Sequence, residues 1–509
     1  MQRLFRNASV VMAGFVVANL LGLLRQVIIN RAFGTSAELD AYFAAFRVPD
    51  LLFNILAGGA LGSAFIPLFA ELIEKNDRPH AWRLASAITN NLLIALSLIA
   101  TVAATAAPLL VKFILAPGFD SATQAITVDL MRIMFLSMII FGVSGLLMGI
   151  HNAHHHFLST SLAPIFYNVG IIVGALSASQ LGVYGLAWGV VLGAALHLVV
   201  QLPALIRHKP HYTFALDLKD SAVQQVGKLM LPRMFGLAVW QINFWVNVSI
   251  ASTLPVGSLS AITIAFQIFT FPQAAIAQAI ATAVFPTLAS HAAKESRDEL
   301  NETLTTALRL TLFLALPAMI GLILLGQPLI ALLFQSGKFD AQSTSLVSWA
   351  LTWYGVGLIS HSIVEVITRA FYAMKDTRTP VVIGAAAMIL NVILSLTLTR
   401  LFAAWNFMPH GGLALANTLA TTIEAIALWM MLGKHNARVI FGSLFNSVWR
   451  SGIATLAMSL AVIGWGQVMS APLWLLSLGG AIVGAAVYFV IALIVRSPEI
   501  KLPKFSRFV

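Results

Sequence analysis

The sequence predicts an all-α integral membrane protein of about 14 transmembrane helices, with two parallel six-helix lobes around a central cavity and two extra C-terminal helices. Three observations predict this fold: the composition, the long apolar runs and the placement of the basic residues. Of 509 residues, 59% are hydrophobic and 10% are charged, and cysteine is absent. A soluble globular protein carries about 25% charged residues. The composition therefore excludes a disordered chain, a disulfide-linked secreted scaffold and an ordinary soluble enzyme.

Long apolar runs recur along the whole chain. A membrane-spanning helix needs about 20 mostly apolar residues. Arg3 and Arg6 precede the first run, but this run is too long for a signal peptide and lacks a small-residue cleavage site, so we expect it to be the first span. The expected spans are 9–33, 41–73, 84–108, 126–150, 158–178, 183–206, 229–252, 258–289, 303–332, 344–373, 380–399, 412–433, 449–469 and 473–495.

The basic residues predict the orientation of these spans. With a cytoplasmic N-terminus, 20 of the 30 Lys and Arg residues fall in segments on the inner side, and only Lys112, Lys338 and Arg400 fall in outer loops. This asymmetry is typical of cytoplasmic loops, and it predicts a multi-pass protein with both termini in the cytoplasm. The net charge of +11 then reflects topology and attraction to anionic lipids, and no nucleic-acid partner is needed to explain it.

Seven basic residues remain inside the expected spans: Arg25, Arg31, Arg47, Arg132, Arg233, Arg309 and Arg369. Arg31, Arg132, Arg233 and Arg309 lie near helix ends, where a long side chain can reach the membrane interface. Arg25 and Arg47 lie about 9–12 Å inside the outer boundary, at 1.5 Å per residue. A charge facing lipid at the bilayer centre costs about 2.5–3.5 kcal/mol, so such residues face protein or water.

Asp50 lies one helical turn beyond Arg47. Charges of both signs in the outer halves of two adjacent helices predict a polar cavity that binds the substrate. The alternative is a structural Arg–Asp pair that holds the first two helices together.

Two pairs of residues indicate an internal repeat. Pro67 and Pro286 close equivalent helices 219 residues apart, and Asn168 and Asn391 lie 223 residues apart. Parallel repeats around a central site are a transporter architecture. We therefore predict an N-lobe at 1–207, a C-lobe at 208–433, and helices 13–14 with a basic cytoplasmic tail at 434–509.

Helix breakers predict bending points. Pro49, Gly58 and Gly59 interrupt the second expected span, and Pro272 interrupts the eighth. Proline frees backbone groups that neighbours or water must satisfy, which favours kinks beside cavities. For the glycines, close helix packing through small residues is an equal alternative.

The sequence predicts no catalytic residue, metal site or cofactor. It contains no nucleotide-binding motif and no acidic metal cluster, so we expect the membrane potential or an ion gradient to drive transport. His151, His154, His155 and His156 are expected to form a polar interfacial loop, with metal binding or pH sensing as the alternative. Glu365, four residues before Arg369, is either half of a structural pair or part of an ion-coupling site, and Glu424 leaves similar alternatives open.

Several segments resemble the MurJ (MviN) family of lipid II flippases, in the multidrug/oligosaccharidyl-lipid/polysaccharide exporter superfamily. The resemblance covers nearly the whole chain. The segments are Arg25 to Gly34, Glu38 to Pro49, Gly59 to Pro67, Ala116 to Phe119, Leu333 to Phe339 and Arg369 to Pro380.

This resemblance implies transfer of undecaprenyl-pyrophosphate-linked peptidoglycan precursor from the inner to the outer leaflet of the bacterial inner membrane by alternating access. Such transport serves peptidoglycan biosynthesis and cell shape, and the partners implied are the lipid-linked precursor, membrane lipids and the cell-wall synthesis machinery. Arginine suits this substrate because it grips phosphate through paired donors. The resemblance also implies that helices 13 and 14 form a groove for the lipid tail.

The predicted substrate site is Arg25, Asp40, Arg47, Asp50 and Gln267, in which Asp50 comes from the charge pattern alone. Arg25 matches a family cavity arginine, Asp40 a family acid and Arg47 a basic position. Three further family arginines are replaced here by Asn19, Phe53 and Gln267.

Gln267 can still donate hydrogen bonds, whereas Phe53 cannot replace a charge. The alternatives are therefore a flippase for another lipid-linked oligosaccharide, a drug/cation antiporter of the same superfamily, or a non-transporting cell-wall scaffold. A membrane enzyme acting on lipid-linked sugars is disfavoured because an acidic metal site is missing.

Overall fold

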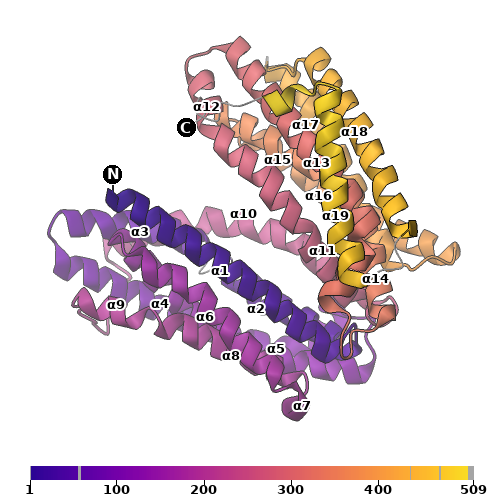
Figure 1. The fold of residues 1–509 in the computed structure, drawn as a ribbon. Helices are drawn as coiled ribbons and strands as arrows, with labels where there is room; N and C mark the ends of the chain where they lie inside the picture. Colours follow the sequence, from indigo (N-terminus) through magenta and orange to yellow (C-terminus); the bar gives the residue numbers. More distant parts are fainter. Residues whose placement is uncertain (1, 55–58, 436, 469–471, 502–509) are drawn as a thin grey trace. The chain divides into compact units, whose positions relative to one another are not determined.

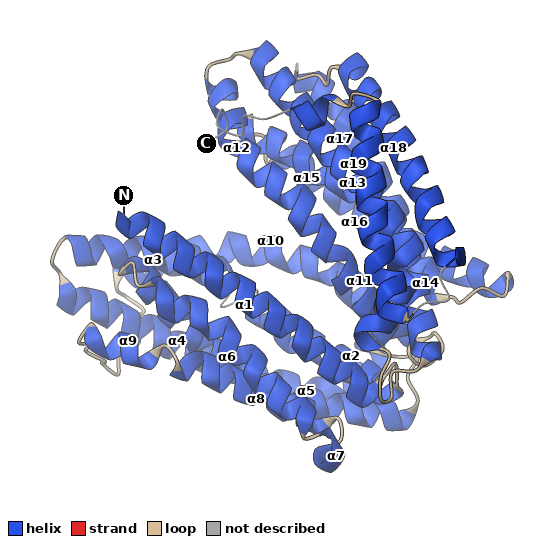
Figure 2. Cartoon of the chain, in the orientation of Figure 1, coloured by secondary structure: helices blue, strands red, loops and turns tan. Residues whose placement is uncertain are grey.

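The computed structural model describes residues 2–54, 59–435, 437–468 and 472–501. The regular structure of these residues is helical throughout (Figure 2). The chain forms two compact units, Met1–Gly257 with Ser336–Phe339, and Ser258–Gln335 with Asp340–Val509. The prediction of an all-α membrane protein is confirmed.

The first unit is a bundle in which the long helices pack side by side (Figure 1). Helix α6 lies against α1 and α8, α5 lies against α2, α4 and α8, and α10 lies against α3. The helices are α1 (Gln2–Phe33), α2 (Ala37–Phe53), α3 (Gly59–Glu74), α4 (Arg78–Leu110), η2 (Val111–Leu115), α5 (Ser121–Ala153), α6 (Phe157–Leu176), α7 (Ala178–Leu181), α8 (Tyr184–Val199), α9 (Leu202–Arg207) and α10 (Ser221–Ser252).

Glycine brings α6 and α8 together. A Cβ at Gly170 would clash with the backbone of Gly193, and a Cβ at Gly174 would meet the backbone of Gly185 and Gly189. Small residues let two membrane helices approach closely enough for their backbones to touch. This close approach brings α6 and α8 to the same wall of the cavity described below.

The second unit holds the remaining helices. Helix α16 packs on α17, α13 packs on α14 and α18, and α18 packs on α19. The elements are α11 (Ser258–Gln273), η3 (Ala274–Gln278), α12 (Ala279–Ala293), α13 (Arg297–Phe334), α14 (Ala341–Val356), α15 (Leu358–Ala373), α16 (Arg378–Ala404), α17 (His410–Leu432), η4 (Gly433–His435), α18 (Phe441–Val468), η5 (Leu475–Gly479), α19 (Gly480–Ile494) and η6 (Pro498–Lys501).

Among the described residues, 11 helices are long and apolar enough to cross a membrane, and the bent pair α14 and α15 makes a twelfth. The prediction had 14 spans. Two of these 14 are not among the twelve. One of the two, predicted at 41–73, covers α2, α3 and residues 55–58, which lie outside the described part of the chain. The other falls on α10, which is 32 residues long.

The boundary between the two compact units lies after α10. Helix α10 contacts α2, α3 and α4, which places it in the first unit. The predicted lobes at 1–207, 208–433 and 434–509 were defined by the internal repeat. Compactness does not test that repeat, so the repeat stays a prediction.

Prolines precede the π-helical turns η2, η3 and η5. Pro108 precedes η2, Pro272 precedes η3 and Pro472 precedes η5, each by two or three residues. Proline removes a backbone donor and its ring collides with the carbonyl four residues earlier, which a local π-turn can absorb. The predicted hinge at Pro272 therefore coincides with an irregular turn. Of the other predicted hinges, Pro49 lies inside α2, Gly59 begins α3, and Gly58 lies outside the described residues.

The Arg309 side chain has protein partners. Its Nε and Nη2 donate to Glu499 Oε1 at 2.9 and 2.7 Å, and its Nη1 donates to Ser443 Oγ at 3.0 Å. The Glu499 side chain is fully buried. This ion pair stabilises the charge of Arg309 within an expected span, and the expectation that its side chain reaches a membrane interface stays a prediction. The pair attaches the segment after α19 to α13.

Candidate substrate-binding cavity

A cavity of about 280 Å³ lies inside the first unit. Helices α2, α5, α6 and α8 line it. Its wall is mainly apolar, with a few polar groups, which is typical of small-molecule sites. The lining residues are Phe46, Pro49, Asp50, Ser137, Met138, Phe141, Gly145, Met148, Pro164, Tyr167 and His197.

Arg25 lies on α1 beside this cavity. Its charge acts on the hydroxyl groups of Tyr42 on α2 and Tyr167 on α6. Its Nε is buried and has no hydrogen-bond partner. A buried donor without a partner is costly, so a ligand that accepts this hydrogen bond is favoured at this position.

The second predicted arginine, Arg47, lies on α2 with its guanidinium over the ring of Phe244, 5.3 Å from the ring centroid. This is within cation–π distance. Its charge also acts on Asp50, which lines the cavity. The structure therefore brings the predicted residues Arg25, Arg47 and Asp50 to one region of the first unit.

Histidine and aromatic side chains form the far wall. His197 Nδ1 shares a 2.6 Å hydrogen bond with Ser144 Oγ, and Gln201 Nε2 donates to the same Oγ at 2.7 Å. The ring of Phe141 makes edge contacts with His197 and Tyr167, at 5.2 and 5.0 Å between centroids. This packing holds the Tyr167 ring at the cavity.

Sequence reasoning missed Tyr42, Tyr167 and His197. The signal for each was a polar residue inside an apolar run. That signal is weak, because a lone polar residue in an apolar run does not reveal which neighbour it faces before α2, α5, α6 and α8 are packed.

Asp40 does not line this cavity. It is 3% exposed, and its Oδ2 accepts a 2.7 Å hydrogen bond from the backbone amide of Gly257. It therefore stabilises the turn after α10. Its assignment to the substrate site stays a prediction.

The positions at which family arginines are replaced lie on α1, α2 and α11. Asn19 is exposed on α1 and donates to the Phe15 carbonyl at 2.8 Å. Phe53 is the last residue of α2. Gln267 is exposed on α11 in the second unit. Its role in substrate binding stays a prediction.

Glu365 and Arg369 form an ion pair on α15, with 3.0 Å between Oε1 and Nη2. Glu424 is half-buried on α17, and its Oε1 lies 3.3 Å from the position that a Cβ on Gly384 would take. The pairing fits the structural alternative for Glu365. The ion-coupling alternative stays a prediction.

Three histidines near residue 151 lie close to His208, which was not a predicted site residue. The ring of His208 lies 4.0 Å from His154, 6.2 Å from His151 and 6.3 Å from His156, between centroids. No group of three or more His, Cys, Asp or Glu suited to a metal occurs among the described residues. Burial, and then the charges of His154 and His156, lower the pKa of His208.

Comparison with known proteins gives one consistent result. The model of the family described as "Lipid II flippase MurJ" matches residues 29–482. A Burkholderia cenocepacia protein named "Lipid II flippase MurJ" is 32% identical over 441 residues, covering 85% of this chain and 84% of that protein.

Solved structures agree. One titled "Lipid II flippase MurJ, inward closed conformation" has a TM-score of 0.80 and 25% identity, and covers 95% of this chain and 98% of its own. An inward-facing multidrug resistance MATE family transporter of the MOP superfamily has a TM-score of 0.68 over 82% of this chain and 94% of its own. At 16% identity, this likeness shows the fold alone.

Proposed function

Because this chain belongs to the MurJ family of lipid II flippases, we propose that it moves lipid II from the inner to the outer leaflet by alternating access. The chain is a multi-pass membrane transporter of a bacterial family and not an enzyme. It serves the lipid II flipping step of peptidoglycan biosynthesis. We propose that both termini lie in the cytoplasm, as the basic residues indicate.

The observation that supports substrate binding in the first unit is the unpartnered Nε of Arg25 beside the cavity. Arginine binds phosphate through paired, charge-assisted donors. In this proposal Arg25 and Arg47 bind the pyrophosphate of the headgroup. Arg25 lies on α1 and Arg47 on α2 of the same unit, and in this proposal their two guanidinium groups share one dianionic group.

The cavity volume limits what it can hold. Drug-sized ligand sites have volumes of about 300–1,000 Å³, so about 280 Å³ does not hold a whole disaccharide-pentapeptide. Asp50, Ser137 and Tyr167 offer hydrogen bonds to hydroxyl or amide groups. We assign to this cavity a sugar or a short part of the peptide next to the pyrophosphate.

Complementation of a strain depleted of its lipid II flippase tests the function. The wild-type chain should restore growth, whereas Arg25→Ala should not, at equal abundance in the membrane. Arg132→Ala is the matched control, since Arg132 is half-exposed on α5, where its Nε donates to the Ala104 carbonyl and its Nη1 lies 3.9 Å from Asp129 Oδ1.

Two results would contradict parts of the proposal. No rescue by a correctly inserted wild-type chain would contradict lipid II transport and favour another lipid-linked glycan or a non-transporting scaffold. Rescue by both wild type and Arg25→Ala would leave the transport function and overturn the cavity assignment.

We propose that the membrane potential or an ion gradient drives transport. Glu424 and the Glu365–Arg369 pair are the candidate coupling groups, because they are carboxylates within spans of the second unit. Flipping measured in proteoliposomes with an imposed potassium diffusion potential or pH gradient should depend on one of these gradients. Equal rates with and without both gradients would contradict the proposal.

A further inference from the structure

The segment between α9 and α10 runs along α4 as an irregular strap, here defined as residues 212–218. Tyr212, Phe214, Leu216 and Leu218 alternate along it and are 62%, 88%, 38% and 64% exposed. The intervening residues are half-buried. The alternating exposure gives the strap one apolar face, and its other face lies against α4.

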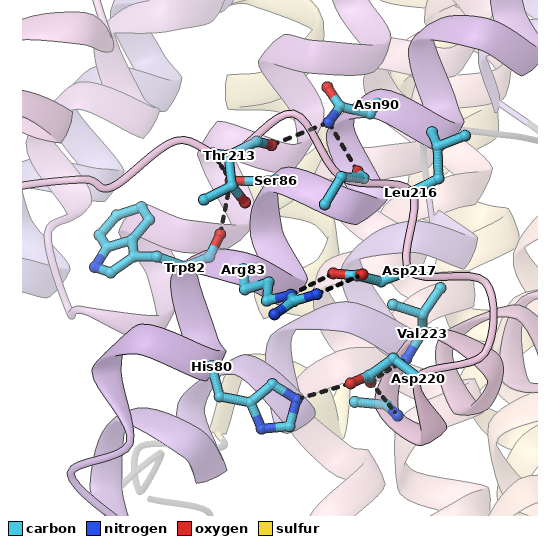
Figure 3. A network of polar contacts seen from close by, with 12 residues as sticks. His80, Trp82, Arg83, Ser86, Asn90, Thr213, Leu216, Asp217, Asp220 and Val223 are labelled. Carbon is cyan, nitrogen blue, oxygen red and sulfur yellow. Dashed lines mark hydrogen bonds and ion pairs between the residues drawn. The ribbon is translucent and has the colours of Figure 1, made fainter.

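Side chains of α4 satisfy the backbone of the strap (Figure 3). Asn90 Nδ2 donates to the carbonyls of Thr213 and Ala215 at 3.2 and 2.9 Å. Asn91 Nδ2 donates to the Leu216 carbonyl at 2.8 Å, and the Thr213 amide donates to Ser86 Oγ at 3.1 Å. These side chains replace the partners that water would otherwise supply.

Charged groups attach the end of the strap. Arg83 Nε and Nη2 donate to the two carboxylate oxygens of Asp217 at 2.7 and 2.9 Å (Figure 3). His80 Nε2 lies 3.2 Å from Asp220 Oδ2, just before α10. The hydrogen bonds to Arg83 also lower the pKa of Asp217. The strap is therefore held to α4 along its length.

The place of the strap on α4 indicates its surroundings. Asn90 lies twelve residues after the start of α4, or about 18 Å along its axis, in a helix apolar enough to span a membrane. Irregular backbone in lipid is tolerated only where its polar groups are satisfied. The strap meets this condition on one face and presents apolar side chains on the other.

Basic residues flank the strap on both sides. Arg207, Lys209 and His211 precede it, and Lys219 follows it. Aromatic residues at the headgroup level and nearby Lys and Arg are the pattern of a segment at the interface of an anionic membrane. A protein partner would not require this pattern.

We propose that the strap is a lipid-binding element embedded in the leaflet on this face of the membrane. Phe214, Leu216 and Leu218 insert among the acyl chains, and Lys209 and Lys219 bind the phosphates of anionic lipids. On the proposed topology this is the cytoplasmic leaflet. The strap binds membrane lipids and not the transported substrate. Its lipid binding is therefore independent of lipid II transport.

Spin labelling tests the depth of the strap in the full chain. The chain has no cysteine, so single-cysteine variants carry one label each. Labels at Phe214→Cys and Leu216→Cys in proteoliposomes should be relaxed by oxygen much more than by a water-soluble nickel chelate. They should match Leu98→Cys, which is exposed on α4, and differ from Lys294→Cys, which is exposed between α12 and α13. Labels at 214 and 216 that match Lys294→Cys would overturn the proposal and indicate a protein-docking segment.

Lipid-specific quenching tests the headgroup. A fluorophore on Phe214→Cys should be quenched more by brominated phosphatidylglycerol than by the same fraction of brominated phosphatidylcholine. The double change Lys209→Gln and Lys219→Gln should remove this difference. Equal quenching of the unaltered strap by both lipids would overturn the anionic-lipid assignment.

Discussion

The backbone amide of Gly257 donates a 2.7 Å hydrogen bond to the carboxylate of Asp40, across 217 residues of chain. Gly257 has φ of +87°, and a Cβ there would lie 2.5 Å from the Thr35 carbonyl oxygen. The family acid therefore has a structural partner at the end of α2 opposite to the cavity.

Replacing Asp40 separates its structural role at Gly257 from its predicted role in the substrate site. Asp40→Asn keeps an oxygen that accepts from Gly257, whereas Asp40→Ala leaves a buried amide without a partner, at a cost of about 1–3 kcal/mol. We expect Asp40→Ala to lower the melting temperature in detergent and Asp40→Asn to retain most of the stability. Loss of complementation by a stable Asp40→Asn protein would contradict a purely structural role.

Gly337 should not tolerate a side chain. It has φ of +62°, and a Cβ would clash with the Arg31 carbonyl oxygen, in a turn where the Lys338 amide donates to that same oxygen at 2.9 Å. Gly182 is the matched control, with φ of +56° and open space around its Cβ position.

Gly182→Ala should cost about 1–3 kcal/mol, because φ of +56° with ψ of −144° is a conformation that few residues other than glycine adopt, and Gly337→Ala should cost about 1–3 kcal/mol more for the clash. Thermal unfolding of the two purified variants measures the difference. Equal melting temperatures would show that the 336–339 turn is not held as described.

The Arg309–Glu499 pair should stabilise the second unit. Removing one partner of a buried pair leaves an uncompensated charge and costs about 3–5 kcal/mol. We expect Arg309→Met to lower the melting temperature strongly, and the double variant Arg309→Met/Glu499→Gln to recover part of the loss. Arg132→Met is the control, because Arg132 is half-exposed. An unchanged melting temperature in Arg309→Met would contradict the pairing.

The histidine cluster predicts a pH dependence of stability. Burial, with the charges of His154, His156 and Arg78, lowers the pKa of His208 in the folded protein. The unfolded chain therefore binds a proton more readily below the ordinary histidine value of about 6.5. The free energy of unfolding therefore decreases as the pH falls below about 6.5, whereas above that value His208 is neutral in both states and causes no loss.

Melting temperatures from pH 8 to pH 5 measure this effect. Wild type should lose more stability over the range than His208→Gln, which does not titrate. Parallel curves for the two proteins would contradict the prediction.

Much of this protein could be predicted from local patterns. Hydropathy and helix length locate the spans, since each span must bury its own backbone hydrogen bonds in lipid. The same patterns singled out Arg25 and Arg47, because a charge inside a span needs a polar neighbour. Both lie beside the cavity of the first unit.

The partner of Arg309 could not be predicted from the sequence. Its position near a helix end is compatible with a membrane interface, and no residue within one helical turn of it is acidic. Its partner Glu499 lies 190 residues away, beyond α19. Pairing at that separation depends on how the chain returns to α13, which no local pattern encodes.

The composition and charge pattern of the sequence by themselves determined the membrane class, the approximate spans and the isolated arginines, because these follow from the cost of placing each residue in lipid. Only the tertiary structure decided which side chains meet. It placed Tyr167 and His197 at the cavity, gave Asp40 a backbone partner and laid the strap on Asn90. These contacts join residues far apart in the chain, and they exist only after the helices have packed.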